Sequence, residues 1–174
     1  ATYVGGSNTE SRPALAITSD GSILVGGGTL SSDIPVTPGA YQASKSSYED
    51  IFVVKLSGDL TTVLAATYLG GSGTDPWGSL VIDVDSSNNA VLGCRSTSAD
   101  FPTTPGVHGP TYFGGTHDIF VAKLTPDLTT LLAATYAELG RQDDALSAME
   151  ELLKLWPGLT AEQWTEHLRK WNYR

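Results

Sequence analysis

The sequence predicts a mainly β protein with an α-helical C-terminal tail, built as two four-stranded antiparallel units followed by two to three helices. Three observations lead to this fold class. One block of the chain occurs twice, apolar and polar residues alternate within each copy, and the apolar spacing changes to a helical period after Tyr136. The 19 glycines and 9 prolines supply the many turns that short strands need.

The internal repeat covers most of the first 136 residues. ATYVGGS returns as ATYLGGS, SSDIPVTPGAYQ as SADFPTTPGVHG, and EDIFVVKLSGDLTTVLAATY as HDIFVAKLTPDLTTLLAATY. The paired segments are 1–7 and 66–72, 31–42 and 98–109, and 49–68 and 117–136. We therefore divide the chain into a first β repeat at 1–65, a second at 66–133 and a tail at 134–174.

Each copy contains four strand-like stretches. In the second copy they read LAATYLGG, SLVIDVD, NAVLGCRS and DIFVAKL. The second and third are joined by the short polar turn SSNN, which is typical of a hairpin, and the third and fourth by a longer loop containing PTTPG. Four short antiparallel strands that recur in this way indicate propeller-like blades.

These motifs resemble the SBBP family, which is named for its seven-bladed β-propeller repeats. The resemblance covers about residues 1–134. It rests on TYLGGSGTD at 67–75, DVDSSNNAVLG at 83–93, SADFPTTPG at 98–106 and DIFVAKL at 118–124. It implies a propeller fold and an extracellular or cell-envelope location, and it supplies no catalytic residues.

The tail has a helical pattern. Apolar residues share one face of a predicted helix that Pro157–Gly158 ends, and Thr160 can cap a further helix. This region resembles the last tetratricopeptide unit of a helical array, although Leu152 stands where that family has a small residue. The segment LAATY at 132–136 fits both a strand and a helix, and we expect strand to about Leu132 and helix from about Ala134.

Two blades are too few to close a propeller ring, which needs about four to eight. Three explanations stay open: a fragment of a longer propeller, two blades packed as a sandwich, or subunits that assemble edge to edge into a ring or filament. The chain starts within a repeated motif, and the second copy is followed by a further occurrence of that motif. Head-to-tail strand pairing could use both ends. A fragment boundary would produce the same pattern. The candidate assembly residues are Ala1, Thr2, Tyr3, Leu132, Ala133, Ala134, Thr135 and Tyr136.

Composition argues against several partners. A net charge of −9 opposes binding to nucleic acid or to an anionic membrane surface. No apolar run reaches the length of a membrane-spanning helix. The chain begins at Ala1 without methionine, which fits either a removed leader or an excised fragment. Cys94 is the single cysteine, so an intrachain disulfide is excluded, and a buried thiol is expected.

Three residue sets have some features of chemical sites. Alternating oxygen side chains in the second copy are spaced as in a calcium loop, but an Asx-rich hairpin turn explains them better. Two loop histidines are better explained as exposed residues than as a metal or acid–base pair. Four aromatic residues could line a carbohydrate platform, but core or loop-anchoring roles are favoured. These sets are Asp83, Asp85, Ser87 and Asn89; His108 and His117; and Trp77, Tyr112, Phe113 and Trp164.

The sequence therefore predicts no catalytic residue, no metal site and no cofactor. The expected function is that of a non-catalytic extracellular structural or scaffold module, which forms a homo-oligomer through strand edges or presents a propeller surface for adhesion. The alternative is a propeller fragment that binds a glycan or a peptide.

Overall fold

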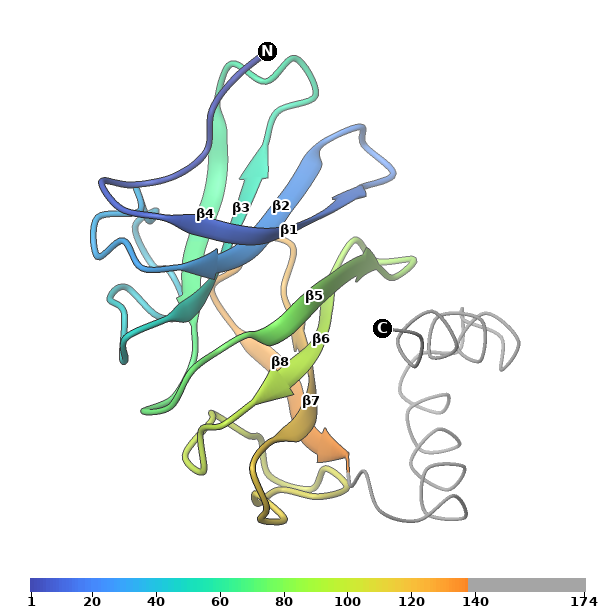
Figure 1. Ribbon diagram of the computed structural model, residues 1–174. Helices are drawn as coiled ribbons and strands as arrows, with labels where there is room; N and C mark the ends of the chain where they lie inside the picture. The colour runs from blue at the N-terminus through green and yellow to red at the C-terminus, as the bar shows by residue number, and fades with distance from the viewer. Residues whose placement is uncertain (138–174) are drawn as a thin grey trace.

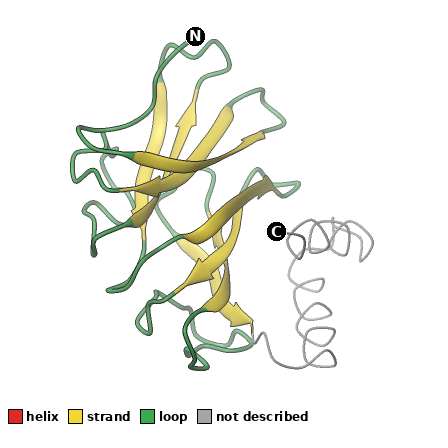
Figure 2. Cartoon of the chain, viewed as in Figure 1, coloured by secondary structure: helices red, strands yellow, loops and turns green. Residues whose placement is uncertain are grey.

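The computed structural model describes residues 1–137, and every regular element in this range is a β-strand (Figures 1 and 2). The strands form two four-stranded antiparallel sheets, each with its strands in sequence order. The first sheet contains β1 (Glu10–Ile17), β2 (Ile23–Thr29), β3 (Asp50–Leu56) and β4 (Val63–Leu69). The second contains β5 (Trp77–Val84), β6 (Ala90–Ser96), β7 (Asp118–Leu124) and β8 (Leu131–Ala137).

The predicted change from strand to helix at Ala134 is wrong. β8 continues to Ala137, which pairs with Ile119 of β7. The ladder with β7 satisfies the backbone groups of this segment, and such non-local pairing overrides the local helix preference of alanine and leucine. The described chain is thus all-β rather than β with a helical tail. The remainder of the predicted helical tail, 138–174, lies outside the described residues.

The strands of the second sheet are paired in the same register as those of the first. Val53 pairs with Thr67 in the first sheet, and Val121 pairs with Thr135 in the second. Each sheet takes its fourth strand from the ATY motif, so β4 includes Ala66, where the predicted second repeat starts. In Figure 1 the two sheets lie next to each other, and β1 of the first runs alongside β5 of the second.

Tight turns with left-handed residues define the hairpins. Leu60 and Leu128 have φ values of 64° and 58° at matching positions of the β3–β4 and β7–β8 turns. The carboxylates of Asp59 and Asp127 accept hydrogen bonds from the hydroxyls two residues before them, Ser57 and Thr125, and from the threonines two residues later, and these bonds lower the pKa of both acids. The same turn chemistry in both copies keeps the two registers equal.

The core has two parts. The larger cluster lies between the sheets and contains Leu24, Val53, Leu92 and Phe120. The smaller cluster lies on the other face of the first sheet, where the loop residue Ile34 covers part of β3 and β4. No helix among the described residues is long and apolar enough to cross a membrane.

Candidate functional site

The interface between the two sheets is asymmetric. The first sheet contributes the face of Ala16, Leu24 and Val53, whereas the second contributes the face of Leu92 and Phe120. Val53 corresponds to Val121 of the second copy, not to Phe120, because DIFVVKL and DIFVAKL align residue for residue. The sheets therefore pack with unlike faces, as successive units of a head-to-tail array do.

A glycine sets the closest approach of the sheets. A Cβ atom at Gly26 of β2 would overlap the Cδ1 atom of Ile82 and would lie 3.2 Å from Cδ2 of Leu80. Both side chains project from β5 onto β2. Because glycine has no side chain, the isoleucine can seat directly on the backbone of the neighbouring sheet.

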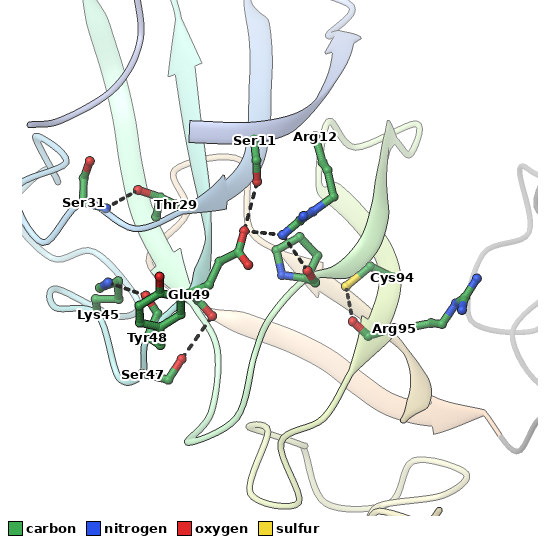
Figure 3. Close-up of polar contacts among 11 residues, drawn as sticks. Ser11, Arg12, Thr29, Ser31, Lys45, Ser47, Tyr48, Glu49, Cys94 and Arg95 are labelled. Carbon is green, nitrogen blue, oxygen red and sulfur yellow. Dashed lines mark hydrogen bonds and ion pairs between the residues drawn. The ribbon is translucent and has the colours of Figure 1, made fainter. Parts of the chain in front are cut away.

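Polar groups join the sheets at one end of the interface. Arg12 lies in a β-bulge of β1 with φ 52°, and its guanidinium donates both to the Glu49 carboxylate and, at 3.0 Å, to the carbonyl of Pro76 (Figure 3). Ser11 also donates to Glu49, at 2.9 Å. The Asp75 amide then donates to the Glu49 carbonyl at 2.8 Å. This group of contacts ties β1 and its sheet to the segment that enters β5.

Two further links lie elsewhere along the interface. The turns after β1 and β5 meet where Ser19 and Asn88 exchange hydrogen bonds at 2.9 Å. The amide of Tyr41, in the long loop of the first copy, donates to the carbonyl of Leu128 at 3.0 Å. The bond between Tyr41 and Leu128 joins backbone atoms alone, so it does not depend on residue type.

The outer face of the first sheet exposes apolar side chains whose counterparts in the second sheet are buried. Leu15 is 61% exposed, whereas its counterpart Ile82 is 9% exposed. Val63 is 40% exposed and its counterpart Leu131 is 8% exposed. The counterparts follow from register, since Leu15 and Ile82 pair with matching residues of β2 and β6. The second sheet buries these positions against the first sheet, and the first sheet leaves them open.

We call this surface the outer face. It is formed by Leu15 and Ile17 of β1, Val25 of β2, Leu60 of the β3–β4 turn and Val63 of β4. Ile17 is also largely exposed, at 63%. Contiguous apolar exposure of this kind marks a surface for protein contact.

The residues predicted from the chain ends lie in two places. Ala1, Thr2 and Tyr3 are exposed and precede the first strand, so they form no strand themselves. The second group, 132–136, lies in β8, the last strand of the second sheet. The structure does not bring the two groups together in one strand pair.

A second feature is a network of acids at the ends of the strands, in which Asp75 is buried and Glu10 is half-buried. The Asp75 carboxylate has no exposed surface and accepts bonds from the Gly71 amide and the Ser98 hydroxyl, at 2.8 and 2.6 Å. Within residues 1–137, its Oδ1 atom has no hydrogen-bond partner. Burial raises the pKa of Asp75 above its ordinary value. Glu10 takes the same place in the first copy, where its carboxylate accepts from Ser31 at 2.6 Å.

An open cleft lies beside this network. Its volume is about 340 Å³, and it is lined by Tyr41, Gln42, Ser46, Gly70, Gly71, Ser72, Asp100 and Pro102. Hydrogen bonds from the amide and hydroxyl of Ser72 lower the pKa of Asp100. The cleft thus offers an ionised carboxylate, an amide side chain and an aromatic ring, groups that suit a polar ligand with hydroxyls.

The sequence-derived calcium set forms a turn. The Asp85 carboxylate accepts from the amides of Ser87 and Asn89, at 2.8 and 2.9 Å, and forms an ion pair with Lys123. Although burial opposes ionisation, the bonds from Asn89 and Lys123 lower the pKa of Asp85. Asp83 bonds to the next amide, at Val84. The Asp85 carboxylate is therefore engaged by Ser87, Asn89 and Lys123.

The remaining sequence candidates are dispersed. His108 is exposed, and His117 lies 3.3 Å from Arg95 through its Nε2 atom. Cys94 is buried, as predicted, and its Sγ atom donates to the Arg95 carbonyl (Figure 3). Among the aromatic residues, Phe113 is exposed and Tyr112 is half-buried. Trp164 lies outside the described residues.

The outer face and the cleft were both missed from the sequence. The segment ALAI at 14–17 is apolar at every position, so its sequence does not show which face of the strand is covered. Which face is covered depends on the packing of a distant sheet. No family model matches this chain, and no curated protein matches it.

Proposed function

We propose that this protein is a non-catalytic structural module that assembles with further copies of itself. The observation that supports the proposal is the outer face: Leu15 and Val63 are exposed in the first sheet, while their counterparts Ile82 and Leu131 in the second sheet are buried by sheet-to-sheet packing. In such a unit the second sheet already packs on the first through these positions, and the first sheet leaves the equivalent positions open to another copy. Head-to-tail addition of copies then gives a ring where the rotation closes and a filament where it does not.

Two other considerations support this proposal. The terminal strands β4 and β8 each pair with one described neighbour, so strand addition is a second route to assembly. The resemblance to SBBP repeats supports propeller-like blades and an extracellular or cell-surface location, where such an assembly would serve as a scaffold or in adhesion.

Molar mass measured by light scattering tests the proposal. We expect the mass of the full chain to rise above that of one chain with concentration in the micromolar range. Replacing Leu15 and Ile17 together with glutamate places two charges on the outer face and should return the mass to that of a monomer. Tyr48→Glu is the matched control, because Tyr48 is 76% exposed and lies in a loop away from this face. A wild-type monomer at all concentrations would refute the proposal.

The cleft favours a second candidate function, the binding of a glycan or a peptide. Its groups are arranged around one hollow rather than scattered, with Tyr41 and Gln42 from the first copy and Asp100 from the second. An array of glycans and peptides would identify a ligand. Its binding should be lost in Tyr41→Ala and Asp100→Ala and kept in Tyr48→Ala. Equal binding by all three variants would place the ligand elsewhere.

A further inference from the structure

The cleft lies where loops of the two copies meet. Its lining residues come from 41–46 in the first copy, from 70–72 in the segment that joins the two sheets, and from 100–102 in the second copy. We propose that this cleft binds a glycan that carries a positively charged amino group, and that this group pairs with the carboxylate of Asp100. The inference rests on the second candidate function, ligand binding in the cleft, and adds the chemical class of the ligand.

Asp100 presents an exposed carboxylate in a fixed position. The amide and the hydroxyl of Ser72 donate to its Oδ1 atom, at 2.7 and 2.9 Å. Within residues 1–137, its Oδ2 atom has no hydrogen-bond partner. The bonds from Ser72 also lower the pKa of Asp100, so the group is ionised at neutral pH. An ionised carboxylate with one oxygen open to solvent can form a charge-assisted hydrogen bond with an ammonium group.

Two further carboxylates lie directly behind the glycines that line the cleft. A Cβ atom at Gly70 would lie 2.8 Å from Cγ of Asp50, and the Gly71 amide donates to Asp75 at 2.8 Å. Neither Asp50 nor Asp75 has exposed surface. Burial is the main cause of the raised pKa of Asp75, and the charge of Asp50 also raises it, so the two carboxylates are close enough to interact. Negative charge is therefore concentrated at this side of the cleft.

No described cation neutralises this charge. Among residues 1–137, Asp50, Asp75 and Asp100 take part in none of the ion pairs. Lys45 lies in one of the loops of the cleft, but its ammonium group donates to two backbone carbonyls. A cleft lined by charge of one sign attracts ligands of the opposite sign, and a partly buried charge without a partner is costly. We therefore expect the ligand to supply the cation.

The other groups of the cleft suit a sugar ring better than a peptide. Tyr41 packs against the larger core cluster and also lines the cleft, so its ring is held in place, and Pro102 adds a second apolar surface. Such surfaces can contact the C–H face of a sugar while polar groups bind its substituents. Extended peptides usually pair with a strand edge, and no lining residue belongs to a strand. The volume of about 340 Å³ also suits a short ligand.

Short glucosamine oligomers provide the test. Oligomers with free amines and fully N-acetylated oligomers of the same length differ in charge, and calorimetric titration of the full chain gives the affinity for each. At a pH where the amines are protonated and at low salt, we expect the wild-type protein to bind the free-amine oligomer about tenfold more tightly or better. Added salt should reduce this preference, because the Asp100 carboxylate is exposed.

A matched pair of variants assigns the preference to the cleft. Asp100→Asn removes the charge and keeps an oxygen for the bonds from Ser72, so the preference should fall to about twofold or less. Asp33→Asn is the control, because Asp33 is exposed and accepts the same two bonds from Ser7, at 2.9 and 3.1 Å, but does not line the cleft. The preference should be unchanged in this variant.

The outcomes separate this inference from the candidate function on which it rests. A preference lost in Asp100→Asn and kept in Asp33→Asn supports the inference. Equal wild-type affinities for the two oligomers overturn the ion pair and leave glycan binding in place, as does binding only to other, uncharged glycans of an array. A preference that both variants keep places the amino group elsewhere. If no glycan or peptide binds, the candidate function fails as well. The wild-type comparison decides even where a variant does not fold.

Discussion

Ile82 packs directly on the backbone of Gly26 across the sheet interface, and the energy of this contact can be measured. Gly26→Ala would add a Cβ that overlaps Cδ1 of Ile82 and lies 2.9 Å from the carbonyl oxygen of Phe52. Overpacking of this kind costs about 1–3 kcal/mol, and the stiffer unfolded chain returns roughly 0.4–1 kcal/mol. We therefore expect a net loss of about 1–2 kcal/mol in the free energy of unfolding.

The partner substitution removes the clashing atom. Ile82→Val deletes Cδ1 and should alone cost about 1 kcal/mol. In the double variant the new methyl group can occupy the vacated space, although the Phe52 carbonyl still opposes it. The combined loss should then be smaller than the sum of the single losses by about 1 kcal/mol, as for residues in direct contact.

Urea unfolding followed by circular dichroism measures all four free energies of the cycle. Ile17→Val is the control, because Ile17 is 63% exposed and loses little by the same truncation. Additivity within about 0.5 kcal/mol would refute the seat. So would a Gly26→Ala variant as stable as the wild-type protein.

Two further predictions concern buried polar groups. Burial holds the pKa of Asp75 above its ordinary value of 3.8. As the pH rises, Asp75 therefore ionises in the unfolded chain before it ionises in the folded protein. The folded protein loses stability between the unfolded pKa and the folded pKa. The melting temperature of Asp75→Asn relative to wild type should therefore rise with pH over this window, and a flat or falling difference would contradict it. Tyr68→Phe should lower the free energy of unfolding by about 1–3 kcal/mol, since the Ile34 amide, now 2.9 Å from the hydroxyl, loses its acceptor while buried. Tyr48→Phe, at an exposed ring, should change the same quantity by less than about 0.5 kcal/mol.

The strands could be predicted because their signals are local. DIFVVKL and DIFVAKL are continuous apolar runs bounded by turn residues, and SDGS and SSNN supply hairpin chemistry between their neighbours. The segment at Leu131–Ala137 could not be settled in this way, since its residues suit both strand and helix. Pairing with β7, a contact across a turn with a left-handed Leu128, decides its conformation.

The candidate surface was less accessible to sequence reasoning. Leu15 and Ile82 occupy equivalent positions and have similar side chains, yet one is exposed and the other buried. The difference comes from which face of each sheet meets the other, and no local pattern encodes it. The buried Asp75 was missed for a related reason: its counterpart is Glu10, so a comparison of the two copies shows a conserved charge type without showing its burial.

The differences between the two copies indicate which contacts are permanent. Arg12 and Asn88 make polar contacts between the sheets of one chain, and their counterparts Ser79 and Gly21 lack the side chains to repeat them. On the proposed assembly, the chain is then a two-sheet unit whose sheets are held together by an apolar core and by polar contacts, and which meets other copies through the apolar outer face. Dilution should separate copies before it unfolds them, since burial of a few aliphatic side chains at about 1.5–3 kcal/mol each must offset the entropy of association.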